Sequence, residues 1–175
     1  MKTAKYLLLL LAASIAPVAA LESDRAQPIE VEADRLEMRE QENISIYEGN
    51  VRLVQGSLKI QSDRMVIHFN DANELTLMQM TGEPARFRQL DESGQEMIGI
   101  GREIDYIESR ALLELRRDAS FEQAGDVIRS ELIRINTETS AIEAGGTESD
   151  NRVKMVIKPR AGQSQQDGGD QAVDE

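Results

Sequence analysis

The fold is decided by the stretch ISIYEGNVRLVQGSLKIQSDRMVIHF, residues 44–69. Apolar and polar residues alternate along it, as at Ile44 and Ile46, and turn residues around Gly49 and Gly56 interrupt the alternation. A period of two is typical of β-strands that bury one face. Glycine with small polar neighbours is typical of tight turns. The stretch therefore predicts antiparallel strands joined by turns.

The alternation extends in both directions, and helical periodicity is nearly absent from Ile29 to Ile157. Strands of about five residues that recur every seven to twelve residues or so indicate an all-β fold. We expect the apolar residues spaced two apart to face one core: Ile29 and Val31, Leu36 and Met38, Ile44 and Ile46, Val51 and Leu53, Leu58 and Ile60, Met65, Ile67 and Phe69, Leu75 and Leu77, Ala85 and Phe87, Ile98 and Ile100, Ile104 and Tyr106, Leu113 and Leu115, Ala119 and Phe121, Ile133 and Ile135, Val153 and Met155.

An internal repeat accompanies the alternation. The segment VRLVQ at 51–55 aligns with ARFRQ at 85–89 and with ASFEQ at 119–123, at offsets of 34 and 68 residues. Repeats of this length are typical of supersecondary units that stack on one another. Chance similarity among amphipathic strands is the alternative, because alternation alone generates some matches.

Both ends of the chain differ from this middle part. Lys2 and Lys5 precede an apolar run from Tyr6 to Ile15 and small residues up to Ala20, which predicts a signal peptide, residues 1–20, cleaved after Ala20. A retained anchor would need about 20 apolar residues. We expect one domain at 21–158 and, from the abrupt change to Gly, Gln, Ser and Asp, a disordered acidic tail at 159–175.

Composition argues against several functions. The formal net charge of −12 disfavours nucleic acid and a polybasic grip on anionic lipid headgroups. Without cysteine, neither disulfides nor thiolate metal sites can form. His68 is the only histidine, and no Gly-x-Ser-x-Gly or phosphate-loop motif is present. We expect no enzyme, no cofactor and no metal.

Three segments in order carry a family resemblance: QPIEVEADR at 27–35, YEGNV at 47–51 and LKIQSDRM at 58–65. Over residues 27–157 the chain resembles the LptA/OstA family of lipopolysaccharide-export proteins. The resemblance implies an open, slightly twisted antiparallel β-jelly-roll in the periplasm, with an apolar groove for the acyl chains of lipopolysaccharide (lipid A). It also implies end-to-end self-association, LptC at the N-terminal edge and the N-terminal domain of LptD at the C-terminal edge. The long acidic tail departs from the family pattern.

Candidate site residues follow from the alternation and the resemblance. The candidate groove lining is Ile44, Ile46, Val51, Leu53, Ile60, Met65, Ile67, Phe87, Ile98, Ile100, Ile104, Tyr106, Leu115, Phe121 and Ile133. Phosphate contacts at the groove rim are expected from Arg35, Arg64, Arg86, Arg88 and Arg102, because guanidinium binds phosphate through paired hydrogen bonds. The edge strands that meet partners are expected at Ile29, Val31, Val153, Met155 and Ile157.

Other interpretations stay open at this point. For the groove residues the alternative is ordinary core packing, and for the arginines it is a solvated strand face paired with Asp or Glu. A closed structural β-solenoid would have a filled interior and no lipid site. A hydrolase would depend on His68 or on a carboxylate pair, and a chaperone for unfolded outer-membrane proteins would also use an apolar concavity.

Overall fold

The computed structural model describes residues 24, 26–91, 93–146 and 152–159, so the predicted signal peptide and most of the predicted tail lie outside the described residues. Two short 3-10 helices, η1 (Glu40–Glu42) and η2 (Glu108–Arg110), accompany the strands. The strands are β1 (Glu30–Glu32), β2 (Arg35–Arg39), β3 (Ile44–Gln55), β4 (Leu58–Phe69), β5 (Leu75–Leu90), β6 (Glu96–Ile107), β7 (Leu112–Gln123), β8 (Asp126–Asn136), β9 (Ile142–Ala144) and β10 (Lys154–Val156).

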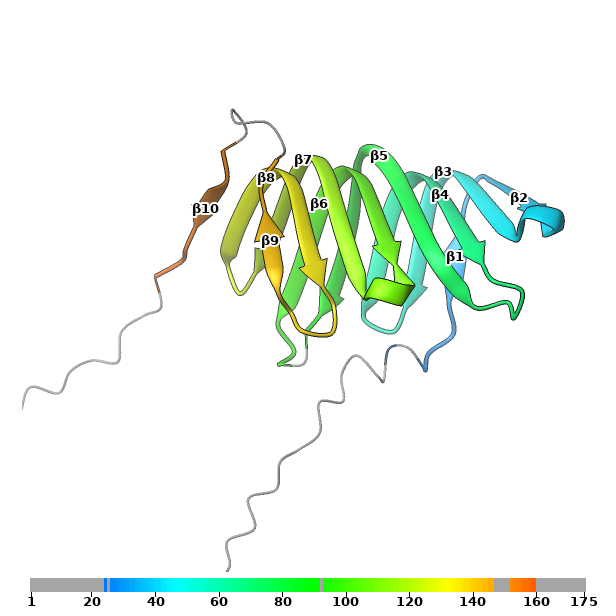
Figure 1. Cartoon of the computed structure of the whole chain (residues 1–175), viewed down its shortest axis with the longest axis horizontal. Coiled ribbons are helices and arrows are strands. Elements are labelled where there is room, and N and C mark those ends of the chain that lie inside the picture. Colours follow the sequence, from blue (N-terminus) through cyan, green and yellow to red (C-terminus); the bar gives the residue numbers. More distant parts are fainter. Residues whose placement is uncertain (1–23, 25, 92, 147–151, 160–175) are drawn as a thin grey trace, which may run out of the picture.

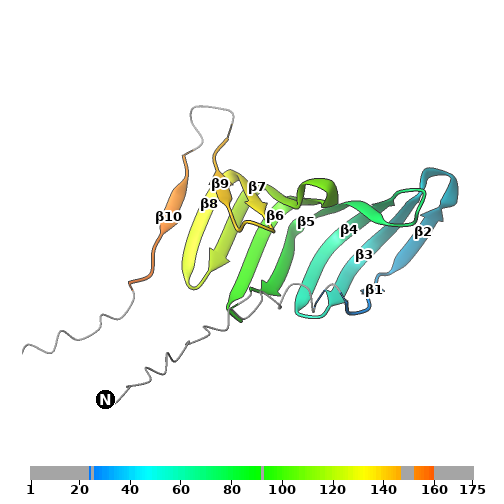
Figure 2. The same ribbon diagram turned by 60° about the horizontal axis from the view of Figure 1, so that its bottom comes forward.

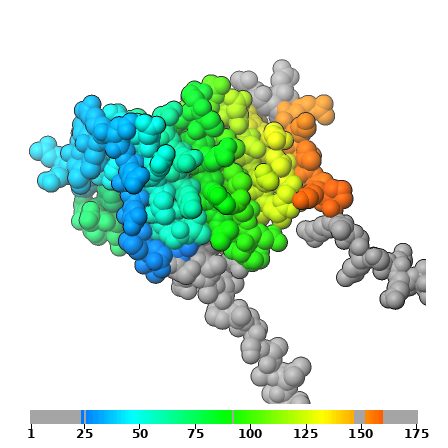
Figure 3. Space-filling model, turned by 180° about the vertical axis from the view of Figure 1, so that it is seen from behind, coloured from blue at the N-terminus to red at the C-terminus, as the bar shows by residue number. Residues whose placement is uncertain are grey.

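These strands form one antiparallel sheet in which neighbours in sequence are neighbours in space. The order is β1-β3-β4-β5-β6-β7-β8-β10, with β2 also on β3 and β9 also on β8. Figure 1 shows the strands side by side from β2 at one end to β10 at the other, and from behind the colours run in sequence order (Figure 3). The sheet does not close on itself, because β1 and β10 are its two ends. The expected open all-β fold is confirmed.

Each end of the sheet carries a strand that is split into two pieces. β1 pairs with the second half of β3, and β2 pairs with the first half. At the other end β9 pairs with the second half of β8, and β10 pairs with the first half. The sheet therefore terminates in two short strands at each end, as Figure 2 shows at its two sides.

The long strands correct one expectation. β3, β4, β6 and β7 are each 12 residues long, not about five, because each runs on through a shift in register. In β3 the shift lies between Glu48 and Val51, where Gly49 and Asn50 have positive φ. The turn expected at Gly49 is thus a β-bulge, which bends a strand without ending it.

The internal repeat recurs in the structure. Val51, Ala85 and Ala119 are each the first paired residue after a register shift, in β3, β5 and β7. The two 3-10 helices lie 68 residues apart and end in the same way, at a left-handed residue, Asn43 or Ala111. The 34-residue unit is a pair of long, bent strands.

The core is a continuous layer on the inner face of the bent sheet. Met65, Met80, Ile104, Leu115 and Ile133 are cross-strand partners in one row over five strands, and each is at most 1% exposed. Burying a large aliphatic side chain contributes about 1.5–3 kcal/mol. This row therefore joins the strands of the sheet into one body.

The outer face carries a cluster of ion pairs around Arg116. Its guanidinium lies 2.6 Å from Asp105 and 2.9 Å from Glu114, and Arg134 lies 2.8 Å from Glu114. Burial raises the pKa of the Asp105 carboxyl above its usual value, and the charge of Arg116 opposes that shift. Asp105 therefore depends on Arg116 for compensation of its charge.

We expect Arg116→Gln to lower the free energy of unfolding at neutral pH by about 1–3 kcal/mol, because it leaves the buried Asp105 carboxylate without its cation. Urea denaturation would measure the loss. The penalty exists where Asp105 is ionised, so the difference from the wild type should narrow as the pH falls and this carboxyl is protonated. Arg117→Gln is the control, since Arg117 is 62% exposed and its pair with Glu103 should contribute little. Equal effects of the two changes would contradict this account.

Candidate functional site

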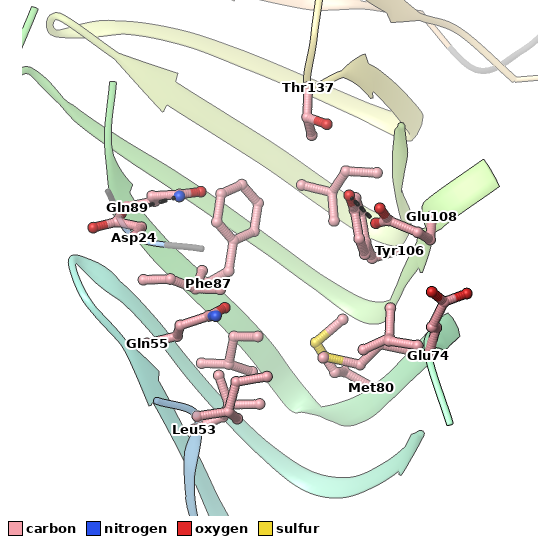
Figure 4. Close-up of a pocket in the computed structure, with 16 residues that line it drawn as sticks. Asp24, Leu53, Gln55, Glu74, Met80, Phe87, Gln89, Tyr106, Glu108 and Thr137 are labelled. Atoms are coloured by element: carbon pink, nitrogen blue, oxygen red, sulfur yellow. Dashed lines mark hydrogen bonds between the residues drawn. The ribbon is translucent and has the colours of Figure 1, made fainter. Parts of the chain in front are cut away.

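The inner face of the sheet encloses a cavity of about 550 Å³. Its apolar wall comes from β3 to β7, and the lining also includes Ile29 just before β1. Figure 4 shows Phe87 projecting into the middle of the lining, with Leu53 and Met80 nearby. The apolar lining residues are Ile29, Leu53, Leu58, Ile60, Leu75, Met78, Met80, Phe87, Tyr106 and Leu113.

Two different polar rims flank this cavity. Asp24, Gln55 and Gln89 lie on one side of Phe87, and Glu74 and Glu108 lie on the other (Figure 4). Gln55 and Gln89 are 34 residues apart, as are Glu74 and Glu108, so the repeat places equivalent residues beside one another on each rim. The cavity is therefore apolar inside and polar at its edges, the usual composition of a site for an amphiphile.

A second, smaller cavity of about 270 Å³ lies toward the C-terminal end. Phe121, Ile128, Ile142 and Met155 contribute its apolar lining. The rings of Phe87 and Phe121 are stacked with centroids 6.4 Å apart. Because Phe87 lines the first cavity and Phe121 the second, the apolar interior extends along most of the sheet.

Most of the predicted groove residues do gather in this interior. Leu53, Ile60, Phe87 and Tyr106 line the first cavity, and Phe121 lines the second. The predicted residues that pack in the same core without lining either cavity are Val51, Met65, Ile67, Ile104, Leu115 and Ile133. The structure thus brings these residues together, while contact of any of them with a lipid stays a prediction.

Four predicted lining residues lie on the outer face, which corrects their grouping with the interior. Ile46 pairs with Val66, whereas its neighbour Tyr47 packs against the core. Ile44 lies two residues before Ile46 on the same strand, so it faces outward too. Leu36 and Met38, also expected to face the core, are 52% and 66% exposed on the end strand β2.

In the part of β6 before its register shift, Gly99 and Gly101 face inward, so the two isoleucines Ile98 and Ile100 face outward. A Cβ at Gly99 would lie 1.8 Å from a ring carbon of Phe87, and a Cβ at Gly101 would lie 3.0 Å from a backbone oxygen. Only glycine fits at such a close approach. The isoleucines instead pair across the outer face with Arg88 and Arg86.

The cavity also uses residues that the sequence reasoning missed. Leu58, Leu75, Met78, Met80 and Leu113 line it, although none was selected as a groove residue. Leu58, Leu75 and Leu113 belonged to alternating pairs, so a signal existed for them. The alternation gave no such signal for Met78 and Met80. The preceding pair, Leu75 and Leu77, predicts that odd-numbered positions of this segment face inward and even-numbered ones outward.

The five candidate phosphate-binding arginines lie away from the cavities. Among the described residues, none of them lines either cavity. Arg64 and Arg35 lie 3.5 and 3.9 Å from Glu48, and Arg102 lies 3.0 Å from Asp118.

The remaining two, Arg88 and Arg86, are on the outer face of β5. Arg88 pairs with Glu96, and Arg86 is the cross-strand partner of Ile100. None of the five thus lies in the described lining of either cavity, and their contact with phosphate stays a prediction. Exposed ion pairs of this kind contribute little to stability.

The candidate edge residues lie at the two ends of the sheet. Val31 is in β1 and packs against the core, and Ile29 lines the first cavity. Met155 is in β10 and lines the second cavity. Val153 and Ile157 flank β10 and are 45% and 67% exposed. Their predicted contacts with partner proteins stay predictions.

His68 lies on the outer face of β4, where it pairs with Ile44 and Leu77. Its Nε2 atom is 3.2 Å from the Gln79 side-chain oxygen. Within the described ranges, no group of three His, Cys, Asp or Glu residues is placed to hold a metal ion. The described part of the chain contains no helix that is long and apolar enough to cross a membrane.

Comparison with known proteins gives one family. Residues 30–141 match the family described as LptA/(LptD N-terminal domain) LPS transport protein. The chain belongs to this family. It is 28% identical over 148 residues to the lipopolysaccharide export system protein LptH of Pseudomonas aeruginosa, covering 81% of this chain and 85% of that protein. It is 28% identical over 151 residues to LptA of Escherichia coli K12, covering 86% and 80%.

The fold comparison agrees with the family. The crystal structure of LptH from Pseudomonas aeruginosa, described as the LptA-homologous periplasmic component of the lipopolysaccharide transport device, matches with a TM-score of 0.71. The two chains are 27% identical, and the match covers 78% of this chain and 99% of LptH. The resemblance noted in the sequence is therefore confirmed, and both relatives named above are lipopolysaccharide export system proteins.

Proposed function

We propose that this chain is a periplasmic carrier that holds the acyl chains of lipopolysaccharide in the apolar cavity on its inner face. The observation that carries the proposal is the cavity of about 550 Å³ with an apolar wall and polar rims, in a member of this family. A closed structural solenoid would fill that space with side chains. An acyl chain gains about 0.8 kcal/mol for each buried methylene.

The same proposal includes assembly end to end. β1 pairs with residues 52–54 of β3, and β10 pairs with residues 127–129 of β8, which lie opposite residues 120–122 of β7. Because residues 52–54 and 120–122 are equivalent in the repeat, β1 and β10 lie on the same side of the register shifts. A second copy placed beyond β10 would therefore continue both halves of the bent sheet. β10 runs parallel to β3, and β1 runs antiparallel to it, so β10 of one copy and β1 of the next would form an antiparallel pair.

Charge at these two edges is complementary. β1 carries Glu30 and Glu32, and β10 carries Lys154 with Lys158 beyond it. Opposite charges on facing strands favour one register of pairing. We further propose that LptC meets the β1 edge and that the N-terminal domain of LptD meets the β10 edge, through the same strand addition.

Photo-crosslinking from the cavity wall tests the carrier. A photoreactive amino acid replaces Phe87, Tyr106 or Phe121, one at a time, in the full chain produced in its native compartment. We expect adducts with lipopolysaccharide from these positions, since Phe87 and Tyr106 line the first cavity and Phe121 the second.

Two outward positions serve as controls for this experiment. Arg52 is exposed on β3, and Ile98 is an apolar residue on the outer face of β6, so neither should label. Absence of adducts from all three interior positions, in protein shown to be folded and exported, would reject the carrier. Labelling of Ile98 as strong as that of Phe87 would reject the inner cavity as the lipid site.

A further inference from the structure

One contact at the rim of the first cavity has the geometry of an anion-binding site. The carboxylate of Asp24 lies on the two-residue turn between β3 and β4, where the backbone N–H of Ser57 donates to Asp24 Oδ1 at 3.0 Å. The Ser57 hydroxyl and the side-chain Nε2 of Gln89 both donate to Asp24 Oδ2. Three donors from two strand pairs thus converge on one carboxylate beside the apolar cavity (Figure 4).

The orientation of these donors is set by the fold. The backbone N–H of Leu90 donates to Ser57 Oγ at 3.1 Å, so the hydroxyl proton of Ser57 is directed at Asp24. Gly56 has φ of +57°, and a Cβ there would lie 2.2 Å from Asp24 Oδ1. The anion therefore occupies the space that the missing side chain leaves. Burial works against ionisation of Asp24, but the hydrogen bonds from Ser57 and Gln89 outweigh it and lower its pKa.

We propose that Ser57 and Gln89 form a phosphate site at the rim of the cavity, that Asp24 occupies it when no ligand is bound, and that a phosphate of a lipid headgroup replaces the Asp24 carboxylate. This inference rests on the proposed function for its ligand. Phosphate offers oxygens of the same kind to the same three donors, and hydrogen bonds to charged groups are among the strong ones. None of the five arginines lines the described part of the cavity, whereas Gln89 lines it and Ser57 is adjacent in sequence to Leu58 of the lining.

The charges on the two rims of the cavity support this position for the phosphate of the headgroup. The opposite rim carries the carboxylates of Glu74 and Glu108, which repel a phosphate. Gln55, on the same side as Gln89, adds a neutral carboxamide. An anionic amphiphile whose chains enter the cavity would therefore place its phosphate over Ser57 and Gln89, and release of Asp24 would accompany its entry.

Binding of two ligands to the full chain tests the site: lipid A with its phosphates and the same lipid A without them. Asp24→Ala removes the competing carboxylate, so we expect affinity for the phosphorylated form to rise about tenfold, the equivalent of one such hydrogen-bonded contact. Affinity for the dephosphorylated form should not change. Equal changes for both forms, or no change for either, would overturn the proposal.

Two further variants separate the site from a general effect of charge. Asp24→Ala with Ser57→Ala, and Asp24→Ala with Gly56→Ala, have the same net charge as Asp24→Ala but should lose the gain. Alanine is tolerated in the left-handed conformation in this chain, at Ala111 and Ala124. Asp91→Ala is the matched control, because Asp91 accepts from Gln123 as Asp24 does from Gln89 but lines neither cavity among the described residues. A tenfold gain in Asp91→Ala would also overturn the site.

A measurement without lipid keeps this inference distinct from the proposed function. Inorganic phosphate added to the Asp24→Ala protein should shift the amide resonance of Ser57 in NMR spectra, and the additional Gly56→Ala change should abolish that shift. A shift at Ser57 without binding of either lipid would uphold the anion site and reject the lipid carrier. Lipid binding with no shift and no preference for phosphate would uphold the carrier and reject the site.

Discussion

We expect Leu115→Ala to lower the free energy of unfolding by about 2–5 kcal/mol, the range measured for such truncations in buried cores. Leu115 is fully buried and lies between its cross-strand partners Ile104 and Ile133 on the two neighbouring strands. The strands on either side are long and paired along their length, so they cannot move together to fill the space. Urea denaturation followed by circular dichroism would measure the loss.

Leu36→Ala is the matched control for this change. Leu36 belongs to the same alternating pattern in the sequence, yet it is 52% exposed on the end strand β2. Its truncation should change the free energy of unfolding by no more than about 0.5 kcal/mol. Equal losses from Leu115→Ala and Leu36→Ala would contradict the assignment of inner and outer positions described above.

We expect truncation of the chain after residue 152 to abolish the proposed end-to-end assembly while the remaining sheet stays folded. It removes β10, whose three residues are all exposed and which pairs only with β8 in the described chain. The new edge would be β8, which runs in the same direction as β1 of the next copy. An antiparallel pair could not form there. Analytical ultracentrifugation over a range of concentrations would show a monomer.

A second truncation after Lys158 controls for the tail. It removes residues 159–175 but keeps β10 and the hydrogen bond from the Lys158 backbone to Asp126. This protein should assemble like the full chain. Assembly of the shorter protein, or loss of assembly in both, would show that β10 is not the edge that joins two copies.

Much of the fold could be predicted from the sequence because it depends on local patterns. Alternation of apolar residues indicates strands wherever one face is buried, and the 34-residue repeat indicates that the strands come in equivalent pairs. The segments at 27–35, 47–51 and 58–65 indicated the family, which the match over residues 30–141 confirms. Interior residues such as Leu53, Ile60 and Phe87 were predicted for the same reason: each lies in a run whose alternation is unbroken.

Other features depended on the neighbouring strands. Each long strand crosses a register shift, and from the sequence alone a glycine inside a shift looks the same as a glycine in a turn. In β6 the shift also changes which residues face inward, from Gly99 and Gly101 before it to Ile104 after it, so Ile98 and Ile100 face outward.

The hydrogen bonds to the Asp24 carboxylate come from Ser57 and Gln89, which are 33 and 65 positions away in the sequence. Only the tertiary structure could reveal them. The sequence by itself determined the strands, their repeat and the family, because these depend on periodicity within each segment. The tertiary structure alone decided the face of each residue beyond a bulge, the cavity and its two rims. These features depend on register and packing between strands, which no single segment contains.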